Sequence, residues 1–157
     1  MSIIKKLLIS NSSQCYELFD QNSGELKFFQ TLGWSLGQLK AQLSKDNNYS
    51  IGIFDNNELS GFLLGDLKSI ENITEYEILL IYVKKEKRNL GNASKLLKNI
   101  SFNPIKKIYL EVAENNLDAI KLYEKNDYKK TGIRKNYYNN INQKKIDALF
   151  FEKKINE

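Results

Sequence analysis

Apolar and polar residues follow each other in patterns that divide the chain into strands and helices. Apolar residues at every second position, or in short unbroken runs, indicate strands, whereas apolar residues spaced three and four apart indicate helices. The strand patterns cover residues 2–9, 49–67, 75–83, 105–113, 128–138 and 143–155. The helical patterns cover residues 12–21, 35–45, 90–100 and 116–126. The turn formers at 55–57 divide segment 49–67 into a hairpin, and residues 139–142 are the expected turn of a second hairpin.

The order of these elements, β-α-α-β-β-β-α-β-α-β-β, predicts an α/β or α+β domain in which helices cover a mixed sheet. Segment 75–83 is apolar on both faces, which is typical of a strand in the middle of a sheet. Ser35 and Gln38 have the spacing of a capping box, so the helix over 35–45 is expected to begin there. A chain of 157 residues suffices for one domain with its own core.

Composition narrows the possible chemistry. The chain has no histidine and one cysteine, Cys15, which excludes histidine catalysis, histidine metal sites, internal disulfides and multi-cysteine zinc sites; we expect no metal. No segment has the roughly 18 continuous apolar residues of a membrane helix, and the start MSIIKKLLIS does not resemble a secretory signal. We therefore expect a cytoplasmic protein without a membrane partner. The net charge of +5 suits an anionic ligand, although a solvated basic surface is the default explanation.

The segment VKKEKRNLGNASKLLKNI, residues 83–100, leaves an apolar strand through a basic loop and continues as a helix. The first amides of a helix have no partner within it and the helix dipole attracts anions, so this loop is a candidate phosphate site. Gly91 and Ala93 leave room for a ligand, and Arg88 adds positive charge. The pattern R-x-x-G-x-A is weak alone, and an ordinary strand-to-helix connection is the alternative. The patterns GxxxxGK[ST] and GxGxxG, typical of nucleotide sites, do not occur.

Three polar residues further along the chain are candidates for chemistry. Glu111 lies inside the apolar strand 105–113, so its carboxylate either points to solvent or lies in a cleft. Asn116 and Tyr123 are two helical turns apart and therefore share one face of the helix over 116–126. Tyr123 is either a core residue with its hydroxyl at the rim or a proton donor near a reacting centre.

Three groups of residues, taken in their order and spacing, resemble the GCN5-related N-acetyltransferases. They are Arg88-x-x-Gly91-x-Ala93 with Leu96-Leu97, then Leu110-Glu111-Val112 with Asn116, Ala119-Ile120 and Leu122-Tyr123, then Arg134, Tyr137-Tyr138 and Asp147-Ala148. Trp34-Ser35 and Gly61-Phe62 are similar to the bacterial ribosomal-protein N-terminal alanine acetyltransferases in particular. The resemblance implies one domain over residues 1–157, with a mixed, mostly antiparallel seven-stranded sheet, helices on both faces and splayed parallel central strands.

The same resemblance implies acetyl-CoA as the acetyl donor, bound where the parallel central strands separate. It gives Glu111 the role of general base and Tyr123 that of general acid. The main chain of the strand would pair with the pantetheine arm, the loop amides would hold the diphosphate, and the helix start would contact the cofactor arm. The implied cofactor-binding residues are Ile81, Tyr82 and Val83 of the strand, then Asn89, Leu90, Gly91, Asn92, Ala93 and Ser94 with their amides, then Asn116. Arg88 of the same loop is also implied to bind the cofactor, through its positive charge.

The resemblance also implies the α-amino group of a protein N-terminus as acceptor, with an N-terminal alanine of a ribosomal protein as the expected target. Trp34, Tyr137 and Tyr138 would wall the acceptor slot, although packing roles are equally open for them. An acetyltransferase for a small-molecule amine would share the cofactor residues and differ only on the acceptor side. A basic RNA-binding module is the alternative from another class, because lysines and tyrosines interleave in YKKTGIRKNYYNN. No RNA-binding motif occurs, so we expect no specific nucleic-acid partner.

Overall fold

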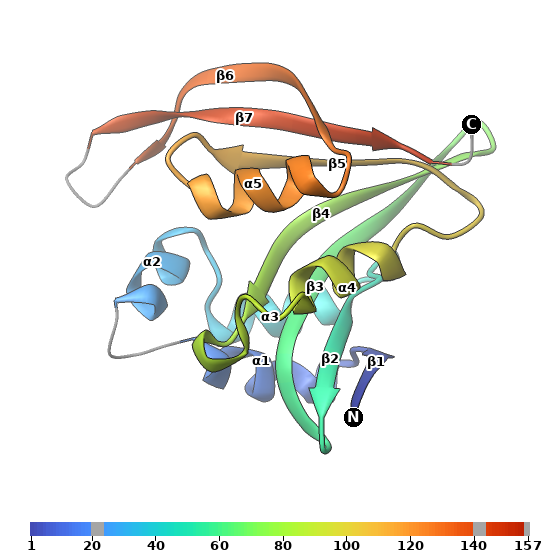
Figure 1. Ribbon diagram of the computed structural model, residues 1–157, viewed down its shortest axis with the longest axis vertical. Helices are drawn as coiled ribbons and strands as arrows, with labels where there is room; N and C mark the ends of the chain where they lie inside the picture. Colours follow the sequence, from blue (N-terminus) through green and yellow to red (C-terminus); the bar gives the residue numbers. More distant parts are fainter. Residues whose placement is uncertain (20–23, 140–143, 156–157) are drawn as a thin grey trace.

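One seven-stranded sheet organises the residues described by the structure, a computed structural model that covers 1–19, 24–139 and 144–155. The strand order is β1-β2-β3-β4-β5-β7-β6 (Figure 1). The strands are β1 (Ser2–Lys6), β2 (Ile51–Asp55), β3 (Glu58–Ile70), β4 (Ile73–Val83), β5 (Ile105–Ala113), β6 (Lys129–Asn139) and β7 (Lys145–Lys154). The α-helices are α1 (Ser12–Leu18), α2 (Glu25–Thr31), α3 (Leu36–Leu43), α4 (Asn92–Asn99) and α5 (Leu117–Lys125).

All neighbouring strands in this sheet are antiparallel except β4 and β5, which run parallel near its centre. A parallel pair needs a crossover connection, and the segment that contains α4 supplies it. The pairing between β4 and β5 ends at Ile78 opposite Leu110. Both strands continue beyond this point, β4 beside β3 and β5 beside β7, so they diverge from each other.

A β-bulge in β4 explains why the two strands diverge at this level. On β3, Leu64 pairs with Leu80 and the next residue, Gly65, pairs with Ile78, so Leu79 is an extra residue in β4. An extra residue bends the strand that carries it and increases its twist. The bend begins where pairing with β5 stops, and it opens a gap between the carboxyl ends of the two parallel strands.

Two hydrophobic cores hold the helices, one on each face of the sheet. Side chains of a strand alternate between faces, so Phe62 and Leu64 of β3 enter one core and Leu63 enters the other. The helices α1 and α3 cover the first face, and the buried side chains there include Cys15, Phe19, Leu39 and Leu43. The helices α4 and α5 cover the second face with Leu96, Leu97, Ile100 and Tyr123. The expected α/β fold with a mostly antiparallel seven-stranded sheet, covered helically on both faces, is confirmed.

The boundaries of several elements differ from the sequence-based expectation for local reasons. The first strand ends at Lys6 rather than at residue 9, because Asn11 accepts a hydrogen bond from the Leu8 amide (2.8 Å) and closes a 3-10 turn. The helix expected over 90–100 begins at Asn92, because Gly91 has φ = 82°, a left-handed conformation outside the helical region. The Ser35 hydroxyl accepts a hydrogen bond from the Gln38 amide (3.2 Å), which confirms it as the cap of α3.

One helix, α2, is not anticipated by the sequence analysis, which assigned nothing to residues 22–34. The expected helix over 12–21 is observed from Ser12 to Leu18. Its last two residues, and residues 140–142 of the expected hairpin turn, lie outside the described residues. Among the described residues, no helix has both the length and the hydropathy required to span a bilayer.

Candidate active site

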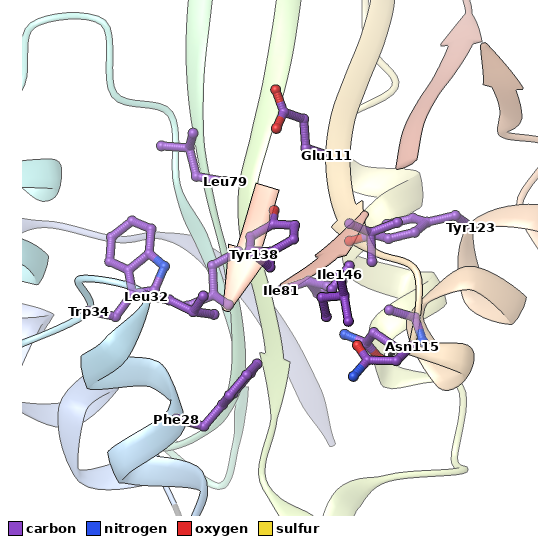
Figure 2. A pocket seen from close by; sticks show the side chains of 15 residues that line it. Phe28, Leu32, Trp34, Leu79, Ile81, Glu111, Asn115, Tyr123, Tyr138 and Ile146 are labelled. Carbon is purple, nitrogen blue, oxygen red and sulfur yellow. Dashed lines mark hydrogen bonds between the residues drawn. The ribbon is translucent and has the colours of Figure 1, made fainter. Parts of the chain in front are cut away.

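Two connected hollows occupy the gap between the diverging ends of β4 and β5. The inner cavity has a volume of about 360 Å³ and contains Glu111 and Tyr123 (Figure 2). The outer cleft has a volume of about 690 Å³ and follows the loop that leads into α4. Both are lined by Ile81, Asn116 and Ala119, so they meet where β4 approaches the beginning of α5.

The outer cleft presents the amino end of α4 to an open space. Asn89 and Gly91 both have left-handed backbone conformations, with φ of 62° and 82°. An added Cβ at Gly91 would meet no protein atom within 4 Å, so the surface above it is open. The amides of the first turn of a helix lack intrahelical partners and carry the positive end of the helix dipole. Main-chain donors at Asn92, Ala93 and Ser94 therefore line a cleft that is suited to an anion.

Positive side chains lie around the outer cleft, but some of them are engaged within the protein. Arg88 donates from Nε to the Val83 carbonyl oxygen (2.8 Å), and its NH2 group lies 3.0 Å from Glu25 Oε1. Lys87 forms an ion pair with Asp55 (2.8 Å), which raises the pKa of Lys87 and lowers that of Asp55. Two further lysines, Lys121 and Lys125, line the cleft from α5. The cleft is thus basic, with Arg88 held in place by protein groups.

Glu111 lies on β5 one residue beyond the last pair with β4, and the divergence of the strands exposes it to the inner cavity. Its side chain is 27% exposed, and Arg134 NH2 lies 3.3 Å from its Oε1 atom. Arg134 is itself half exposed and stacks over the Tyr137 ring at 4.5 Å. Ion pairs of this exposure contribute little to stability because water competes for both partners. The Glu111 carboxylate is therefore accessible from the inner cavity, with the Arg134 guanidinium beside it.

Tyr123 enters the inner cavity from α5, on the side away from Trp34 (Figure 2). Its ring packs against Tyr128 and Phe151, with ring centroids 5.6 and 6.4 Å away, and the residue is only 5% exposed. Burial raises the pKa of the Tyr123 phenol above its ordinary value, and the nearby Tyr138 adds to this effect. The hydroxyl therefore keeps its proton at neutral pH, as a proton donor must. Asn116 caps α5 by accepting a hydrogen bond from the Ala119 amide (3.2 Å).

The remaining walls of the inner cavity come from segments that are far apart in the sequence. Phe28 and Leu32 come from α2 and the residue that follows it, and Trp34 comes from the turn before α3. Leu79 and Ile146 contribute apolar surface from β4 and β7. Figure 2 shows Trp34, Leu32 and Phe28 on one side of the cavity, Tyr138 near its centre and Tyr123 on the other side. This half of the cavity is apolar, in contrast to the half that holds Glu111.

Tyr138 reaches the inner cavity because β6 carries an irregularity. The pairing of β6 with β7 shifts register between Arg134 and Tyr138, and Asn136 has a left-handed φ of 54°. Asp147 on β7 holds this bulge: its Oδ1 atom accepts from the Asn136 amide (2.9 Å), and Lys135 lies 3.2 Å from the other oxygen. Burial and the negative charge of Glu111 raise the pKa of Tyr138 to about 12, so this phenol also stays neutral.

Residues 12–128 match the Acetyltransferase (GNAT) family. The chain belongs to that family. GNAT proteins are acyltransferases that use acetyl-CoA, and the match spans both the loop before α4 and the helix that carries Tyr123. No curated protein matches the sequence.

Solved GNAT structures share the fold over almost the entire chain. The ribosomal-protein-S18-alanine N-acetyltransferase of Escherichia coli has a TM-score of 0.82 and 19% identity, covering 100% of this chain and 96% of that chain. NAA60 of Arabidopsis thaliana, in complex with a bisubstrate analogue, has a TM-score of 0.81 and 18% identity, covering 99% of each chain. A probable acetyltransferase of Staphylococcus epidermidis has a TM-score of 0.80 and 18% identity, covering 99% of this chain and 100% of that chain. The TM-scores show that the chain shares the GNAT fold. Sequence identities this low leave the substrate open.

The structure brings most of the candidate site residues expected from the sequence to the two hollows. Those that line the inner cavity are Trp34, Ile81, Glu111, Asn116, Tyr123 and Tyr138. Those that line the outer cleft are Ile81, Tyr82, Val83, Arg88, Asn89, Gly91, Asn92, Ala93, Ser94 and Asn116. Leu90 and Tyr137 line neither hollow; they are 63% and 50% exposed. Within the described ranges, no group of three or more His, Cys, Asp or Glu side chains could hold a metal ion.

The sequence analysis missed the contribution of α2 to this candidate site. Glu25 lines the outer cleft, while Phe28 and Leu32 line the inner cavity. These residues, with Phe29, follow the i, i+3, i+4, i+7 spacing of an amphipathic helix. That spacing was the available signal. The signal is weak because α2 has only seven residues and its N-cap is a glycine, which has no capping side chain.

Proposed function

We propose that this protein is an N-acetyltransferase that transfers the acetyl group of acetyl-CoA to the N-terminal α-amino group of a protein. The observation that carries the proposal is the junction of two hollows at the diverging ends of β4 and β5. An amide-lined basic cleft meets a cavity that holds a carboxylate and a buried phenol, and Ile81, Asn116 and Ala119 border both. An N-terminal alanine of a ribosomal protein is the acceptor that we propose first.

The outer cleft has the features that coenzyme A requires. Its diphosphate would bind the amides that follow Gly91, where the open space above the glycine permits close approach. The pantetheine arm would extend along Ile81, Tyr82 and Val83, in the manner of an added strand, where β4 no longer pairs with β5. Asn116 would border the arm where the two hollows meet. When bound, acetyl-CoA supplies an acetyl group activated as a thioester.

Glu111 and Tyr123 would carry the acid–base steps. An α-amino group has a pKa of about 8, so it is mostly protonated at neutral pH and must lose a proton before it can attack the acetyl carbon. Glu111 would accept this proton, directly or through a water molecule. Tyr123 would deliver its proton to the departing sulfur, and burial keeps that proton in place beforehand. Each such role contributes roughly 10²- to 10⁴-fold in rate.

The size and the apolar lining of the inner cavity favour an acceptor whose first residue is small and uncharged. The cavity has a volume of about 360 Å³, and the reacting groups would occupy part of it. Phe28, Leu32 and Trp34 form an apolar wall beside the remaining space. Trp34 and Tyr138 would border the acceptor chain, and the Tyr137 ring would support Tyr138, since the two ring centroids lie 5.0 Å apart. The similarity in fold to the ribosomal-protein-S18-alanine N-acetyltransferase is consistent with a protein acceptor.

A panel of peptides that differ only in their first residue would test the proposal. We expect acetylation of peptides that begin with alanine or serine, at the α-amino group by mass spectrometry, and slow reaction with a leucine or lysine start. An α-acetylated peptide containing an internal lysine serves as the control for side-chain acetylation. Faster turnover of a polyamine or an aminoglycoside than of any peptide would replace this proposal with acetylation of a small-molecule amine.

A further inference from the structure

Glu25 of α2 forms a polar cluster with two residues of the outer cleft. Its carboxylate oxygens lie 3.0 and 3.2 Å from Arg88 NH2, and its Oε2 atom accepts a hydrogen bond from the Tyr82 hydroxyl (2.5 Å). The Arg88 guanidinium also stacks over the Tyr82 ring at 5.2 Å. Three elements therefore converge on one carboxylate: α2, strand β4 and the loop that leads to α4.

The position of Glu25 on α2 connects this cluster to both hollows. Residues at i, i+3, i+4 and i+7 of a helix lie on one face, and here these are Glu25, Phe28, Phe29 and Leu32. Glu25 and Phe29 face the outer cleft, and the Phe29 ring packs edge-on against Tyr82 at 5.3 Å. Phe28 and Leu32 line the inner cavity. One short helix thus contributes a wall to each hollow.

Several contacts hold α2 in this position: Leu26 and Phe29 pack against the first core, and the Gln30 side chain donates a hydrogen bond to the Tyr16 hydroxyl (3.1 Å). The helix has seven residues, begins at a glycine in the left-handed conformation and contains no fully buried residue. Helices of this length are not stable alone in water and depend on tertiary contacts. Phe29 supplies an apolar contact through stacking with Phe19 at 4.5 Å. The Glu25 cluster supplies directional polar contacts, and it ties α2 to the same loop that presents the amides around Gly91.

We propose that Glu25 is a positioning residue that fixes α2 against the cofactor loop and thereby shapes the acceptor wall, at the expense of affinity for acetyl-CoA. The inference rests on the proposed function, because it assigns the outer cleft to coenzyme A and the inner cavity to the acceptor. Glu25 places a negative charge in a cleft meant for a diphosphate, and it occupies the guanidinium of Arg88. Its presence there is unfavourable for cofactor binding and favourable for the placement of Phe28 and Leu32.

The test is the substitution Glu25→Gln, with the affinity for acetyl-CoA and the KM for an alanine-start peptide measured separately. We expect acetyl-CoA to bind roughly two- to fivefold more tightly, because a negative charge leaves the cleft and Arg88 is released. We expect the KM for the peptide to rise roughly tenfold, because α2 loses its polar contact with the cofactor loop, with kcat changed less. A residue that only stabilised the fold would not move the two affinities in opposite directions.

Two further variants separate the ion pair from general effects of charge. Glu86→Gln removes a carboxylate from the exposed turn before Arg88, outside the cluster, and should leave the KM for the peptide unchanged. In an Arg88→Gln background, Glu25→Gln should raise the KM for the peptide less than twofold, because the Arg88 partner of Glu25 is already absent. Glu25→Asp keeps the charge but shortens the side chain, so it should raise the KM for the peptide without tightening acetyl-CoA binding.

Each result bears on one of the two claims. Equal KM values for the peptide in the wild type, Glu25→Gln and Glu25→Asp would overturn the positioning role, as would independent, additive effects of Glu25 and Arg88. If Glu25→Gln does not fold, the Glu25→Asp result decides the same point. Failure of the wild-type protein to bind acetyl-CoA would instead overturn the proposed function on which the role of Glu25 rests.

Discussion

The outer cleft and the inner cavity are adjacent, yet the chain builds them in different ways. Most of the outer cleft comes from one continuous segment, residues 81–94, and its principal donors are main-chain amides. The inner cavity combines side chains from α2, the turn before α3, and strands β4 to β7, including Trp34, Glu111 and Tyr138. A binding site made of main-chain groups keeps its donors when the side chains around it are substituted. A binding site made of side chains changes its shape and chemistry with each substitution.

This contrast suggests how one fold can keep its donor and change its acceptor. The conformation of the outer cleft depends on a glycine with positive φ, a helix start and a β-bulge, all of which are backbone features. The apolar wall of the inner cavity depends on the identity of Phe28, Leu32 and Trp34. Substitutions in the first region should therefore affect acetyl-CoA binding, and substitutions in the second should affect the acceptor.

The largest effect should come from the acid–base pair. We expect Glu111→Gln and Tyr123→Phe each to lower kcat by roughly 10²- to 10⁴-fold, with the affinity for acetyl-CoA nearly unchanged, because they remove proton transfer and leave the outer cleft intact. Glu77→Gln on β4 and Tyr109→Phe on β5, which lie outside both hollows, are matched controls. Steady-state kinetics and calorimetry would measure both quantities. Wild-type kcat in both site variants would remove the catalytic assignment.

Two glycines allow a matched test of the contrast. Gly91 and Gly33 have φ of 82° and 90°, and an added Cβ at either would meet no atom within 4 Å. Alanine at each therefore introduces the same kind of backbone strain, about 1–2 kcal/mol. We expect Gly91→Ala to weaken acetyl-CoA binding roughly tenfold, and Gly33→Ala, beside Trp34, to raise the KM for the peptide instead. Loss of acetyl-CoA affinity in both variants would contradict the separation of the two regions.

A smaller effect is expected from the apolar wall. Leu32→Ala removes part of the surface that would cover the acceptor, and we expect the KM for the peptide to rise roughly three- to tenfold while acetyl-CoA affinity stays constant. Leu8, which is 60% exposed and outside both hollows, gives the control Leu8→Ala. Peptide titrations at saturating acetyl-CoA would measure the change. An unchanged KM in Leu32→Ala would show that the acceptor does not contact this wall.

The smallest effect should come from Asp147, which acts on Tyr138 only through the bulge. The Asn136 amide and Lys135 hold the pKa of Asp147 below its ordinary value. A group whose pKa is lowered by folding stabilises the folded state above its unfolded pKa, and this contribution disappears as pH falls through the folded pKa. Asp147→Ala should therefore unfold at lower urea concentration than the wild type at pH 7, with a much smaller difference near pH 3.

The same Asp147→Ala variant should raise the KM for the peptide by roughly two- to threefold, because Tyr138 loses its fixed position. Asp46→Ala, at an exposed position outside both hollows, is the control for a lost surface carboxylate. A stability difference between Asp147→Ala and wild type that stays the same at both pH values would show that Asp147 contributes no linked proton.

The amino-acid sequence was most informative where the determinants are local. The glycine before a helix, the seven-residue spacing of Asn116 and Tyr123, and Glu111 in an apolar strand all point to positions that the structure brings together around the two hollows. The arrangement of the sheet and its splay followed from the family resemblance, because strand order depends on contacts between distant segments.

Other parts of the site could not be read from local patterns. The approach of α2 to the cofactor loop depends on a contact between Glu25 and Arg88, which are 63 positions apart. Tyr138 enters the cavity only because a bulge held by Asp147 shifts its register, and alternation alone does not reveal such a shift. Arg88 was expected at the diphosphate, and the structure adds that its guanidinium is already bound by Glu25 and by the Val83 carbonyl.

Thermal unfolding of the wild-type protein with acetyl-CoA, ATP or NAD tests the central claim most directly, namely that the outer cleft binds coenzyme A. Acetyl-CoA at about 100 times its Kd should add about 2.7 kcal/mol of stability. For a chain of this size that corresponds to an increase in Tm of roughly 5–10 °C. ATP and NAD at the same concentration should give much smaller shifts, because they lack the pantetheine arm. Equal shifts with all three nucleotides, or none with acetyl-CoA, would contradict the account.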